Sequence, residues 1–507
     1  MKKRILALIM SMLLVACTVL TLASCKDEDD EQGVGPNIAW IDNLGDHDLG
    51  GATINFAVAE AAENDGFNER SIVASADTGD RVDTAIYNRN KNIEARFNCK
   101  INLAFVQAEN LADTTVKNVL MSKGTEYDVL AARQYDDVVL CSDGLLLDLF
   151  SNESTKKYLD VTKDWWGTEY IQGMTYNKKA FWLTGDLNLR YTGGFYATFV
   201  NAKIYDNNFK NNEEFGDIHQ LVKDGRWTVD MLKTLSDKAT TVSADDPKPG
   251  EIPSGEVIGV AFPVHDTTNG LAVSCGVKFS TTNNDGSITF TFVRGNSTLT
   301  SYYQKYYDLL STKGCVNYFG AGDNGGYKGA FEDFAADKAL FVLGRVNQAE
   351  LYLRKMDSGF YIIPNPKLNE QQKNYVSSLH DAISIYGINP HSTQIEASAI
   401  VLEAMAAESY RSVRPEYYDM ALKNKYTTDP GTKEMIELIS ESAYSDFALV
   451  WAFTTYFHVG GRQGNLGNFL RVEFRDGVSD ISRDLNNAGD KWQNAIGEID
   501  AAFAKLN

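Results

Sequence analysis

Histidine and cysteine are scarce in this chain, since its 507 residues include six of each. The sequence has no CxxC pair and no HExxH motif, so it lacks the common spacings of zinc sites and zinc peptidases. It also has no GxSxG turn of serine hydrolases, and no GKS or GKT ending that would make a glycine-rich loop a phosphate loop. These absences favour a ligand-binding protein over an enzyme, and we expect no metal and no cofactor.

Positive charge is also in short supply. The chain has 48 Lys and Arg against 68 Asp and Glu, which gives a formal net charge of −20. Nucleic acids and anionic membrane surfaces attract basic proteins, so we expect neither as a partner. The acidity suits an exported protein that must stay in solution.

Long apolar runs are absent after the first 25 residues, and those residues form a leader. Met1–Arg4 is basic, Ile5–Leu22 is mostly apolar, and Leu22–Cys25 reads LASC, which resembles a bacterial lipobox. We expect a signal peptide at 1–24, a lipid on Cys25 and an extracytoplasmic protein anchored to the cell membrane. Cys17 is an alternative lipidation site, and an uncleaved membrane helix is an alternative to the leader.

Four cysteines follow the leader, and each lies in or beside an apolar run: Cys99, Cys141, Cys275 and Cys315. We expect buried free thiols. A disulfide stays open, because the sequence does not establish one.

The first part of the folded chain alternates strands with helices. Strands are expected at Thr53–Ala59, Lys100–Val106 and Tyr127–Ala131, with helices at Arg81–Phe97 and Leu111–Met121. This order predicts a parallel sheet, whose ligands lie beyond the carboxyl ends of the strands. The residues at those ends are Glu60, Arg133, Gln134 and Tyr135.

The stretch Phe181–Asn201 divides the chain. Its second half is rich in aromatic and β-branched residues and predicts a strand, and Gly193 and Gly194 before it can absorb backbone rotation. Another run of strands and helices follows, with helices expected at Val229–Ala239, which Thr228 can cap, and at Ser297–Leu310, and with a hairpin turn at Asn283–Gly286. We therefore predict a crossing between two lobes here, with the glycine pair as its hinge.

Several segments in order resemble the extracellular solute-binding proteins of family 1, the substrate-capturing lipoproteins of bacterial ABC importers. The resemblance covers most of residues 50–460 and is carried by YDVLAARQYDDVVLCSDGLLLDL, WLTGDLNL, RWTVDML, KALFVLGR and IIPNPKLNEQQKNY. It implies an α/β, two-lobe periplasmic-binding-protein-like fold of type II, with a central cleft and three crossings near 190–200, 338–346 and 380–388. It also implies a monomer that binds a sugar or oligosaccharide and docks on the permease subunits of an ABC importer.

The expected division of the chain follows from these crossings. Residues 1–24 are the signal peptide, and 25–50 are the anchor and tether. The first lobe comprises 51–192 with about 338–385, and the second comprises 193–337 with about 386–507.

A sugar site needs aromatic faces and planar polar groups. The aromatic candidates lie near lobe edges: Tyr135, Trp165, Trp166, Tyr191 and Trp451. The polar candidates follow sheet strands or lie beside crossings: Glu60, Arg133, Gln134, Asp186, Arg345 and His380. Neighbouring residues cannot share one face of an element, so at least one of Trp165 and Trp166 is expected to be exposed or at a cleft.

Two other functions stay open from the sequence. A mostly helical outer-surface glycan-binding lipoprotein of the starch-binding type would fit the acidic start and the aromatic content. A secreted glycoside hydrolase stays open because carboxylates are plentiful, and only the separation of a pair defines that chemistry.

Overall fold

The computed structural model describes residues 39–60, 67–107, 111–319, 326–422, 430–452, 456–459 and 462–506. The described helices and strands lie within the unit Ile41–Asn507. The predicted leader, Cys17, Cys25 and the start of the tether lie outside the described residues. None of the helices in the described ranges is both long and apolar enough to cross a membrane.

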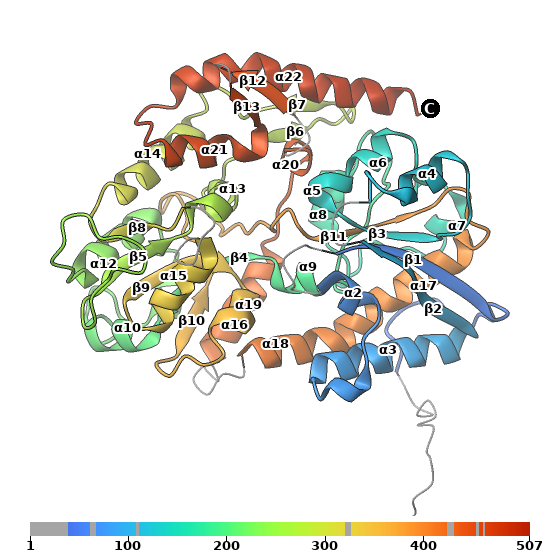
Figure 1. The fold of residues 1–507 in the computed structure, drawn as a ribbon, viewed down its shortest axis with the longest axis horizontal. Coiled ribbons are helices and arrows are strands. Elements are labelled where there is room, and N and C mark those ends of the chain that lie inside the picture. The colour runs from blue at the N-terminus through green and yellow to red at the C-terminus, as the bar shows by residue number, and fades with distance from the viewer. Residues whose placement is uncertain are drawn as a thin grey trace, which may run out of the picture. The chain divides into compact units, whose positions relative to one another are not determined.

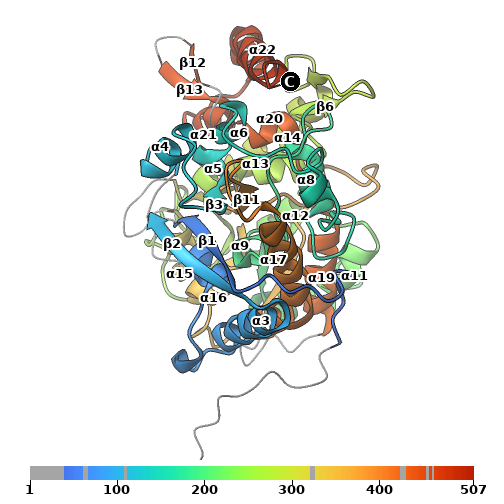
Figure 2. The ribbon, with the colours of Figure 1, turned by 90° about the vertical axis from the view of Figure 1, so that its right-hand side faces the viewer.

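The first sheet is built from four strands. They are β1 (Ala52–Ala59), β2 (Cys99–Gln107), β3 (Val129–Arg133) and β11 (Ser384–Ile388), in the order β11-β3-β1-β2. β1 runs parallel to both β2 and β3, whereas β11 runs antiparallel to β3 (Figure 2). The parallel sheet predicted for the first lobe is confirmed, and its carboxyl edge is where β3 ends at Arg133.

Helix α3 (Arg81–Phe97) packs against this sheet, and residues within the helix and just before it determine where it begins and which face it buries. Its N-cap Asp80 accepts hydrogen bonds from the N–H groups of Val82 (2.7 Å) and Asp83 (3.3 Å). Ile86 and Ile93 are buried on one face at helical spacing. The shorter first-lobe helices are α2 (Phe67–Ile72), α4 (Thr115–Met121), α5 (Gln134–Asp137), α6 (Val139–Ser142), α7 (Glu153–Lys156), α8 (Thr168–Met174) and α9 (Leu189–Gly193).

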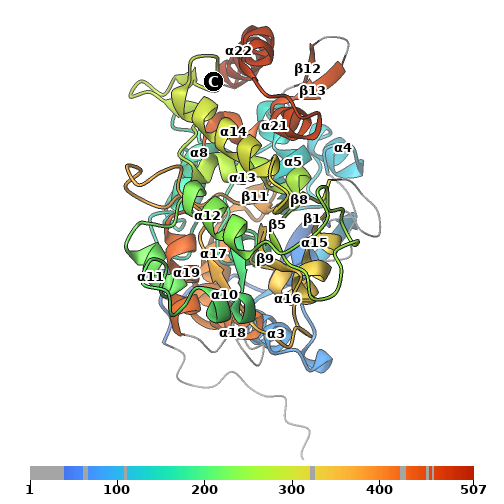
Figure 3. The ribbon, with the colours of Figure 1, turned by 90° about the vertical axis from the view of Figure 1, so that its left-hand side faces the viewer.

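The second sheet has five strands in the order β10-β4-β9-β5-β8. Figure 3 views the molecule from the side on which β5, β8 and β9 of this sheet are labelled. They are β4 (Tyr196–Asn201), β5 (Ile258–Phe262), β8 (Cys315–Asn317), β9 (Ala339–Arg345) and β10 (Phe360–Ile363). The main helices around it are α12 (Val229–Ala239) and α14 (Ser297–Leu310), both as predicted. The others are α10 (Ala202–Asn208), α11 (Ile218–Lys223), α13 (Val264–Ser274), α15 (Gly326–Ala335) and α16 (Gln348–Tyr352), and β6 (Ser280–Thr282) and β7 (Ile288–Phe290) form the expected hairpin.

The structure corrects the predicted division between the lobes. β9, expected to return to the first lobe, lies between β4 and β5 in the second sheet, and β11 belongs to the first sheet. Within KALFVLGR, the residues between Lys338 and Arg345 are apolar and buried, and a strand buried on both faces suits the centre of either sheet. Its sequence therefore carries no sign of which strands it pairs with.

Within the described ranges, three segments cross between the two sheets. The first leads through α9 into β4, as predicted for Phe181–Asn201, and the second runs from 376 to 383 into β11. The third uses α17 (Ile395–Glu408), the π-helical turn η2 (Ser409–Val413) and α18 (Arg414–Leu422), which contacts both α3 and α16. Helix α19 (Pro430–Glu441) then packs on β10. The predicted crossing near 338–346 is replaced by this helical one.

The C-terminal segment contacts both lobes. It contains α20 (Phe447–Val450), the hairpin of β12 (Tyr456–Val459) and β13 (Arg462–Asn465), α21 (Leu466–Arg475) and α22 (Ser482–Ala504). In Figure 1, α22 runs along the top of the molecule from the side of α14 and α21 towards α6. Trp492 packs against Phe292 of the second lobe, and Phe503 stacks on Tyr176 of the first.

The four cysteines of the folded chain are buried and free, as predicted. Burial raises the pKa of Cys99 to about 11 and that of Cys141 to about 12. These thiols are inert core residues. The two sheets also argue against the mostly helical alternative.

Candidate functional site

The carboxyl end of β3 places three of the predicted residues beside the second crossing. The Gln134 N–H donates to the Ile383 carbonyl (3.1 Å), and the Tyr135 N–H donates to the Asp381 carbonyl (2.9 Å). The Arg133 guanidinium pairs with Asp136 and lies 5.5 Å from the centre of the Tyr135 ring. The first lobe thus presents a cation and an aromatic face next to the crossing segment.

The second lobe contributes Arg345 at the carboxyl end of β9. Arg345 is paired across the sheet with Tyr196, the first residue of β4. Its guanidinium lies 5.0 Å from the centre of the Tyr327 ring. The Arg345 N–H donates to Gln348 Oε1 (2.5 Å), which fixes the turn into α16.

His380 lies on the crossing segment and meets both lobes. Its N–H donates to the Gly194 carbonyl (3.1 Å), and its ring centre lies 5.9 Å from that of Tyr196. The Ala382 N–H donates to His380 Nδ1 (3.1 Å), a contact that suits the neutral ring. Asp381 Oδ1 lies 3.2 Å from the same nitrogen.

Two further arginines at this place were not predicted. Arg190 Nη1 on α9 donates to the Ala382 carbonyl (2.9 Å), and Arg471 Nη2 on α21 lies 3.9 Å from Asp381 Oδ2. Both are buried. Arg190 stands three positions before Gly193 and lies within the predicted crossing, so its position in the sequence could have pointed to the site. Arg471 lies on a helix that the sequence did not predict, and nothing near it in the chain pointed to the site.

The imidazole of His380 is buried and has several charged neighbours. Burial lowers the pKa of His380 well below its usual value, and Arg345, Arg471, Arg190 and Arg133 lower it further. A carboxylate as close as Asp381 would act in the opposite direction. We call these residues, with Tyr135, Tyr196 and Asp381, the interlobe site.

A second group of predicted residues lines a separate cavity of about 330 Å³. Trp166, Asp186 and Tyr191 reach it from the first lobe, and the third crossing and the end of α19 complete it. The full lining is Thr162, Lys163, Asp164, Trp166, Thr168, Glu169, Asp186, Tyr191, Tyr410, Arg414, Tyr418, Ser440, Glu441 and Ala443.

An ion pair organises this cavity. Arg414 Nη1 lies 3.2 Å from Asp186 Oδ2, and the Arg414 guanidinium lies 5.1 Å and 5.3 Å from the ring centres of Tyr410 and Tyr418. Asp186 is 3% exposed. Burial raises the pKa of Asp186 to about 6, and Arg414 opposes the rise. The carboxylate is thus committed to Arg414.

Both predicted tryptophans are buried, at 6% and 4% exposure. The Trp165 Nε1–H donates to Glu403 Oε1 (2.9 Å), and the Trp166 Nε1–H donates to Glu403 Oε2 (2.8 Å). Trp166 lines the cavity, and the sequence had predicted that at least one of the two tryptophans would be exposed or at a cleft. Trp165 does not line it. Glu403 on α17 orients both rings.

The two remaining candidates lie apart from these groups. Glu60 follows β1, and its Oε2 accepts a hydrogen bond from the Glu69 N–H (2.6 Å) at the start of α2. Trp451 is buried beside Phe447 and Phe503, with ring centres 5.9 Å and 5.8 Å away. Within the described ranges, no group of three or more His, Cys, Asp or Glu side chains could hold a metal ion.

The fold is similar to that of solved binding proteins, although the sequences differ. A cyclo/maltodextrin-binding protein complexed with maltotetraose aligns at a TM-score of 0.54 and 12% identity, over 88% of this chain and 97% of that one. An ABC transporter solute-binding protein from Thermotoga lettingae bound to α-D-tagatose gives 0.51 and 12%, over 90% and 100%. The GacH receptor of Streptomyces glaucescens, solved unliganded and with acarbose, gives 0.50 and 13%, over 89% and 98%.

No family model and no curated protein matches the chain by sequence. The structural likeness nevertheless agrees with the sheets and crossings described above. The chain has the two-lobe α/β fold of type II periplasmic binding proteins.

Proposed function

We propose that this chain binds a saccharide at the interlobe site and delivers it to the permease of an ABC importer. One observation carries the proposal: His380 lies on a crossing segment and meets groups from both lobes. Arg133 approaches from the end of β3, while Tyr196 and Arg345 belong to the second sheet. In such sheets ligands bind beyond the carboxyl ends of the strands. The three similar structures include complexes with maltotetraose, α-D-tagatose and acarbose, which supports this class.

The chemistry of the interlobe site suits a saccharide. Tyr135 and Tyr196 offer aromatic faces for the apolar side of a sugar ring. Guanidinium and carboxylate groups offer planar hydrogen-bonding partners for hydroxyls. A ligand that contacts both lobes stabilises the arrangement in which they are close, so binding shifts the population of lobe positions.

Thermal unfolding of the chain without its leader, across neutral and charged mono- and oligosaccharides, tests the proposal. We expect at least one saccharide to raise the melting temperature and to bind in calorimetry. Arg345→Gln should weaken that binding about tenfold, since hydrogen bonds to charged groups contribute about 1.5–3 kcal/mol. Arg483→Gln is the control, because Arg483 is 81% exposed and pairs with its neighbour Asp484. Failure of every saccharide to bind would contradict the proposal.

The cavity at Trp166 is the other place where predicted residues gather, so Trp166→Ala locates the ligand. Affinity that is lost in Arg345→Gln and kept in Trp166→Ala assigns the ligand to the interlobe site. The reverse pattern assigns it to the cavity and contradicts the location proposed here.

The anchor and the partner are part of the same proposal. Cys25 carries the lipid, and the loaded protein docks on permease subunits in the membrane. Labelling cells with a fatty-acid analogue should mark the natural chain and not Cys25→Ser. Labelling that persists in Cys25→Ser and disappears in Cys17→Ser would move the anchor to Cys17.

A further inference from the structure

The cavity at Trp166 has walls from both lobes and from two of the crossings, and its volume is about 330 Å³. Trp166 belongs to the first lobe, and Tyr191 lies on α9, which leads into the first crossing. Arg414 begins α18 of the third crossing, and Glu441 ends α19, which packs on β10 of the second sheet. A molecule held here would contact both lobes at a place separate from the interlobe site.

One wall of the cavity binds a cation of the chain itself. The Arg414 guanidinium lies 5.1 Å and 5.3 Å from the ring centres of Tyr410 and Tyr418. Arg414 Nη1 lies 3.2 Å from Asp186 Oδ2, and Arg414 Nη2 donates to Ser440 Oγ (3.3 Å). Aromatic rings and a carboxylate thus contact one positive group, as in other cation–π sites.

Three further carboxylates line the cavity, those of Asp164, Glu169 and Glu441. They are exposed, and within the described ranges none of the three side chains makes a hydrogen bond or an ion pair. Lys163, the second cation of the lining, lies 3.5 Å from Asp160 Oδ2, which is outside the lining. Asp164 and Glu169 belong to the first lobe and Glu441 to α19, so like charges line the cavity from both sides. A cationic ligand would offset their repulsion, whereas a neutral or anionic ligand would not.

A buried hydroxyl points independently to a ligand at this place. Tyr191 lines the cavity and is only 9% exposed, and its hydroxyl has no hydrogen-bond partner among the described residues. A buried hydroxyl without a partner costs free energy, which a ligand with an N–H group would recover by donating to its oxygen. Trp166 adds a second aromatic ring, and its own N–H is bonded to Glu403.

We propose that the cavity at Trp166 binds a small organic cation that carries protonated amines. A metal ion does not fit, because no group of three or more His, Cys, Asp or Glu side chains in the described part of the chain could hold one. An elongated cation with separated amines can reach carboxylates on both sides of the cavity. It is a second ligand, distinct from the saccharide of the interlobe site, and its binding does not depend on the proposed transport function.

Matched ligands test the charge. Putrescine, agmatine and spermidine are compared by calorimetry with the diol that has the same four-carbon chain as putrescine, and with magnesium chloride. On the chain without its leader, we expect at least one amine to bind about tenfold or more tightly than the diol and than magnesium, since the aromatic rings favour an organic cation. Its affinity should fall as sodium chloride rises from about 50 to about 500 mM, because salt screens charge.

Variants assign the binding to the cavity. Glu441→Gln removes one charge at an exposed position and should weaken binding of the amine about fivefold. Tyr191→Phe removes only the hydroxyl and should weaken binding about threefold or more. Glu437→Gln on the same helix is the matched control, because Glu437 is 53% exposed, pairs with Lys433 and does not line the cavity. Far-ultraviolet circular dichroism confirms that each variant is folded.

Several results would overturn the proposal. One is that none of the three amines binds more tightly than the diol. Another is that magnesium binds as tightly as the amines, which would mean that the carboxylates attract any cation. Amine binding that is equal in Glu441→Gln and the natural protein, or lost in Arg345→Gln alone, would place the cation outside the cavity. Failure of every saccharide to bind would leave this second site standing, so the two proposals are tested separately.

Discussion

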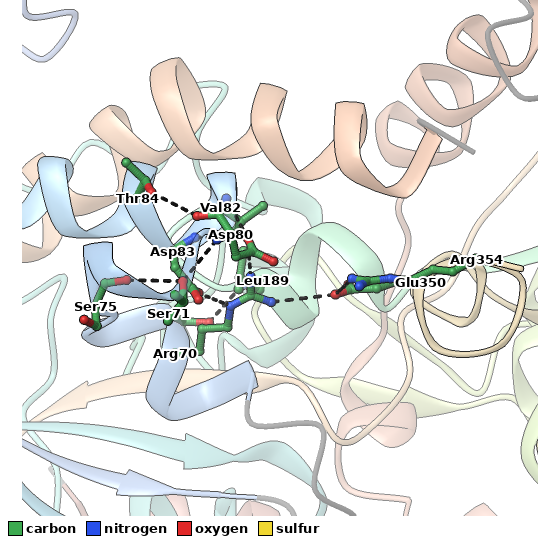
Figure 4. Close-up of polar contacts among 11 residues, drawn as sticks. Arg70, Ser71, Ser75, Asp80, Val82, Asp83, Thr84, Leu189, Glu350 and Arg354 are labelled. Atoms are coloured by element: carbon green, nitrogen blue, oxygen red, sulfur yellow. Dashed lines mark hydrogen bonds and ion pairs between the residues drawn. The ribbon is translucent and has the colours of Figure 1, made fainter. Parts of the chain in front are cut away.

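Arg70 Nη1 on α2 lies 3.8 Å from Glu350 Oε1 on α16, and this ion pair joins the first lobe to the second (Figure 4). Each partner is held within its own lobe. Arg70 Nη2 lies 2.9 Å from Asp80 Oδ1, and Arg354 Nη2 donates to Glu350 Oε1 (2.7 Å). Burial raises the pKa of Glu350, and Arg70 and Arg354 oppose the rise. The contact favours the lobe arrangement seen here.

Glu350→Gln should weaken that arrangement. We expect a loss of up to about 1 kcal/mol, or about fivefold in the equilibrium between lobe positions, since the pair is only partly buried. Spin labels on cysteines introduced at the exposed Lys91 and Lys328 report the interlobe distance in the chain without its leader and Cys25, because Cys99, Cys141, Cys275 and Cys315 are buried. Asp237→Asn, which breaks the intralobe pair with Lys233, is the control. Identical distance distributions in Glu350→Gln and the natural protein would show that the pair does not hold the lobes.

The carboxylate of Glu403 predicts a pH dependence of stability. Burial raises its pKa to about 7, while hydrogen bonds from Trp166, the Asp160 backbone and Trp165 oppose the rise. In the unfolded chain the group titrates near 4.5. The folded state thus keeps its proton over a range in which the unfolded state has lost it. Stability from this group is complete below pH 4.5 and declines as the pH rises through about 7.

Glu403→Gln should remove that decline, which amounts to at most about 3–4 kcal/mol at about 1.4 kcal/mol per pKa unit. Urea unfolding at pH 5 and pH 8 measures it, as the difference between the two free energies of unfolding. Glu396→Gln on the same helix is the matched control, because the Glu396 side chain is 55% exposed. An equal pH slope in Glu403→Gln and the natural protein would refute the assignment.

Local signals account for what the sequence predicted well. Helices α3 and α12 begin where Asp80 and Thr228 cap them, and both were predicted with their observed bounds. Capping and helical spacing act within a few residues, so a single sequence shows them. The position of Arg133, Gln134 and Tyr135 at the end of a strand was also predicted from a local pattern, and their role in ligand binding stays a prediction.

The features that the sequence did not predict depend on contacts between segments that are far apart in the chain. The sequence of β9 does not indicate that it pairs with β4 and β5, so the lobe to which it belongs could not be predicted. Arg471 reaches the interlobe site only because α21 packs near the second crossing. Trp165 and Trp166 were predicted from their adjacency, but their shared partner Glu403 lies 237 residues beyond Trp166. No local pattern encodes that contact.

Gly193 has a packing role beyond the hinge role predicted for it. An added Cβ there would lie 2.1 Å from Tyr417 Oη and 3.0 Å from Asn347 Cβ. Tyr417 belongs to the third crossing and is fully buried. Gly194 is similar, since its Cβ would lie 2.2 Å from the Arg190 carbonyl oxygen. Glycine is needed here because segments approach closely, and the hinge role stays a prediction.

Gly193→Ala should therefore lower the free energy of unfolding by about 1–3 kcal/mol, through overpacking. Adding Tyr417→Phe should recover part of this loss, because it removes the atom that the new methyl group meets first. Among the described residues the Tyr417 hydroxyl has no hydrogen-bond partner, so Tyr417→Phe alone should change stability little. Chemical denaturation of the double-mutant cycle measures the coupling. If the two changes simply added, the contact would not be the cause.

The two ends of helix α22 pack against different lobes. The Trp492 ring centre lies 4.9 Å from that of Phe469 in the second-lobe core, and the Phe503 ring stacks on Tyr176 of the first lobe at 4.6 Å. Phe503→Ala should lower the free energy of unfolding by about 3 kcal/mol or more, because it removes packing at the first-lobe end of α22 alone. We expect faster hydrogen exchange over 498–506 and a broader interlobe distance distribution, while exchange near Trp492 changes little. Tyr176→Phe keeps the stacked ring and should have a much smaller effect. A distance distribution unchanged in Phe503→Ala would mean that α22 only covers the lobes and does not link them.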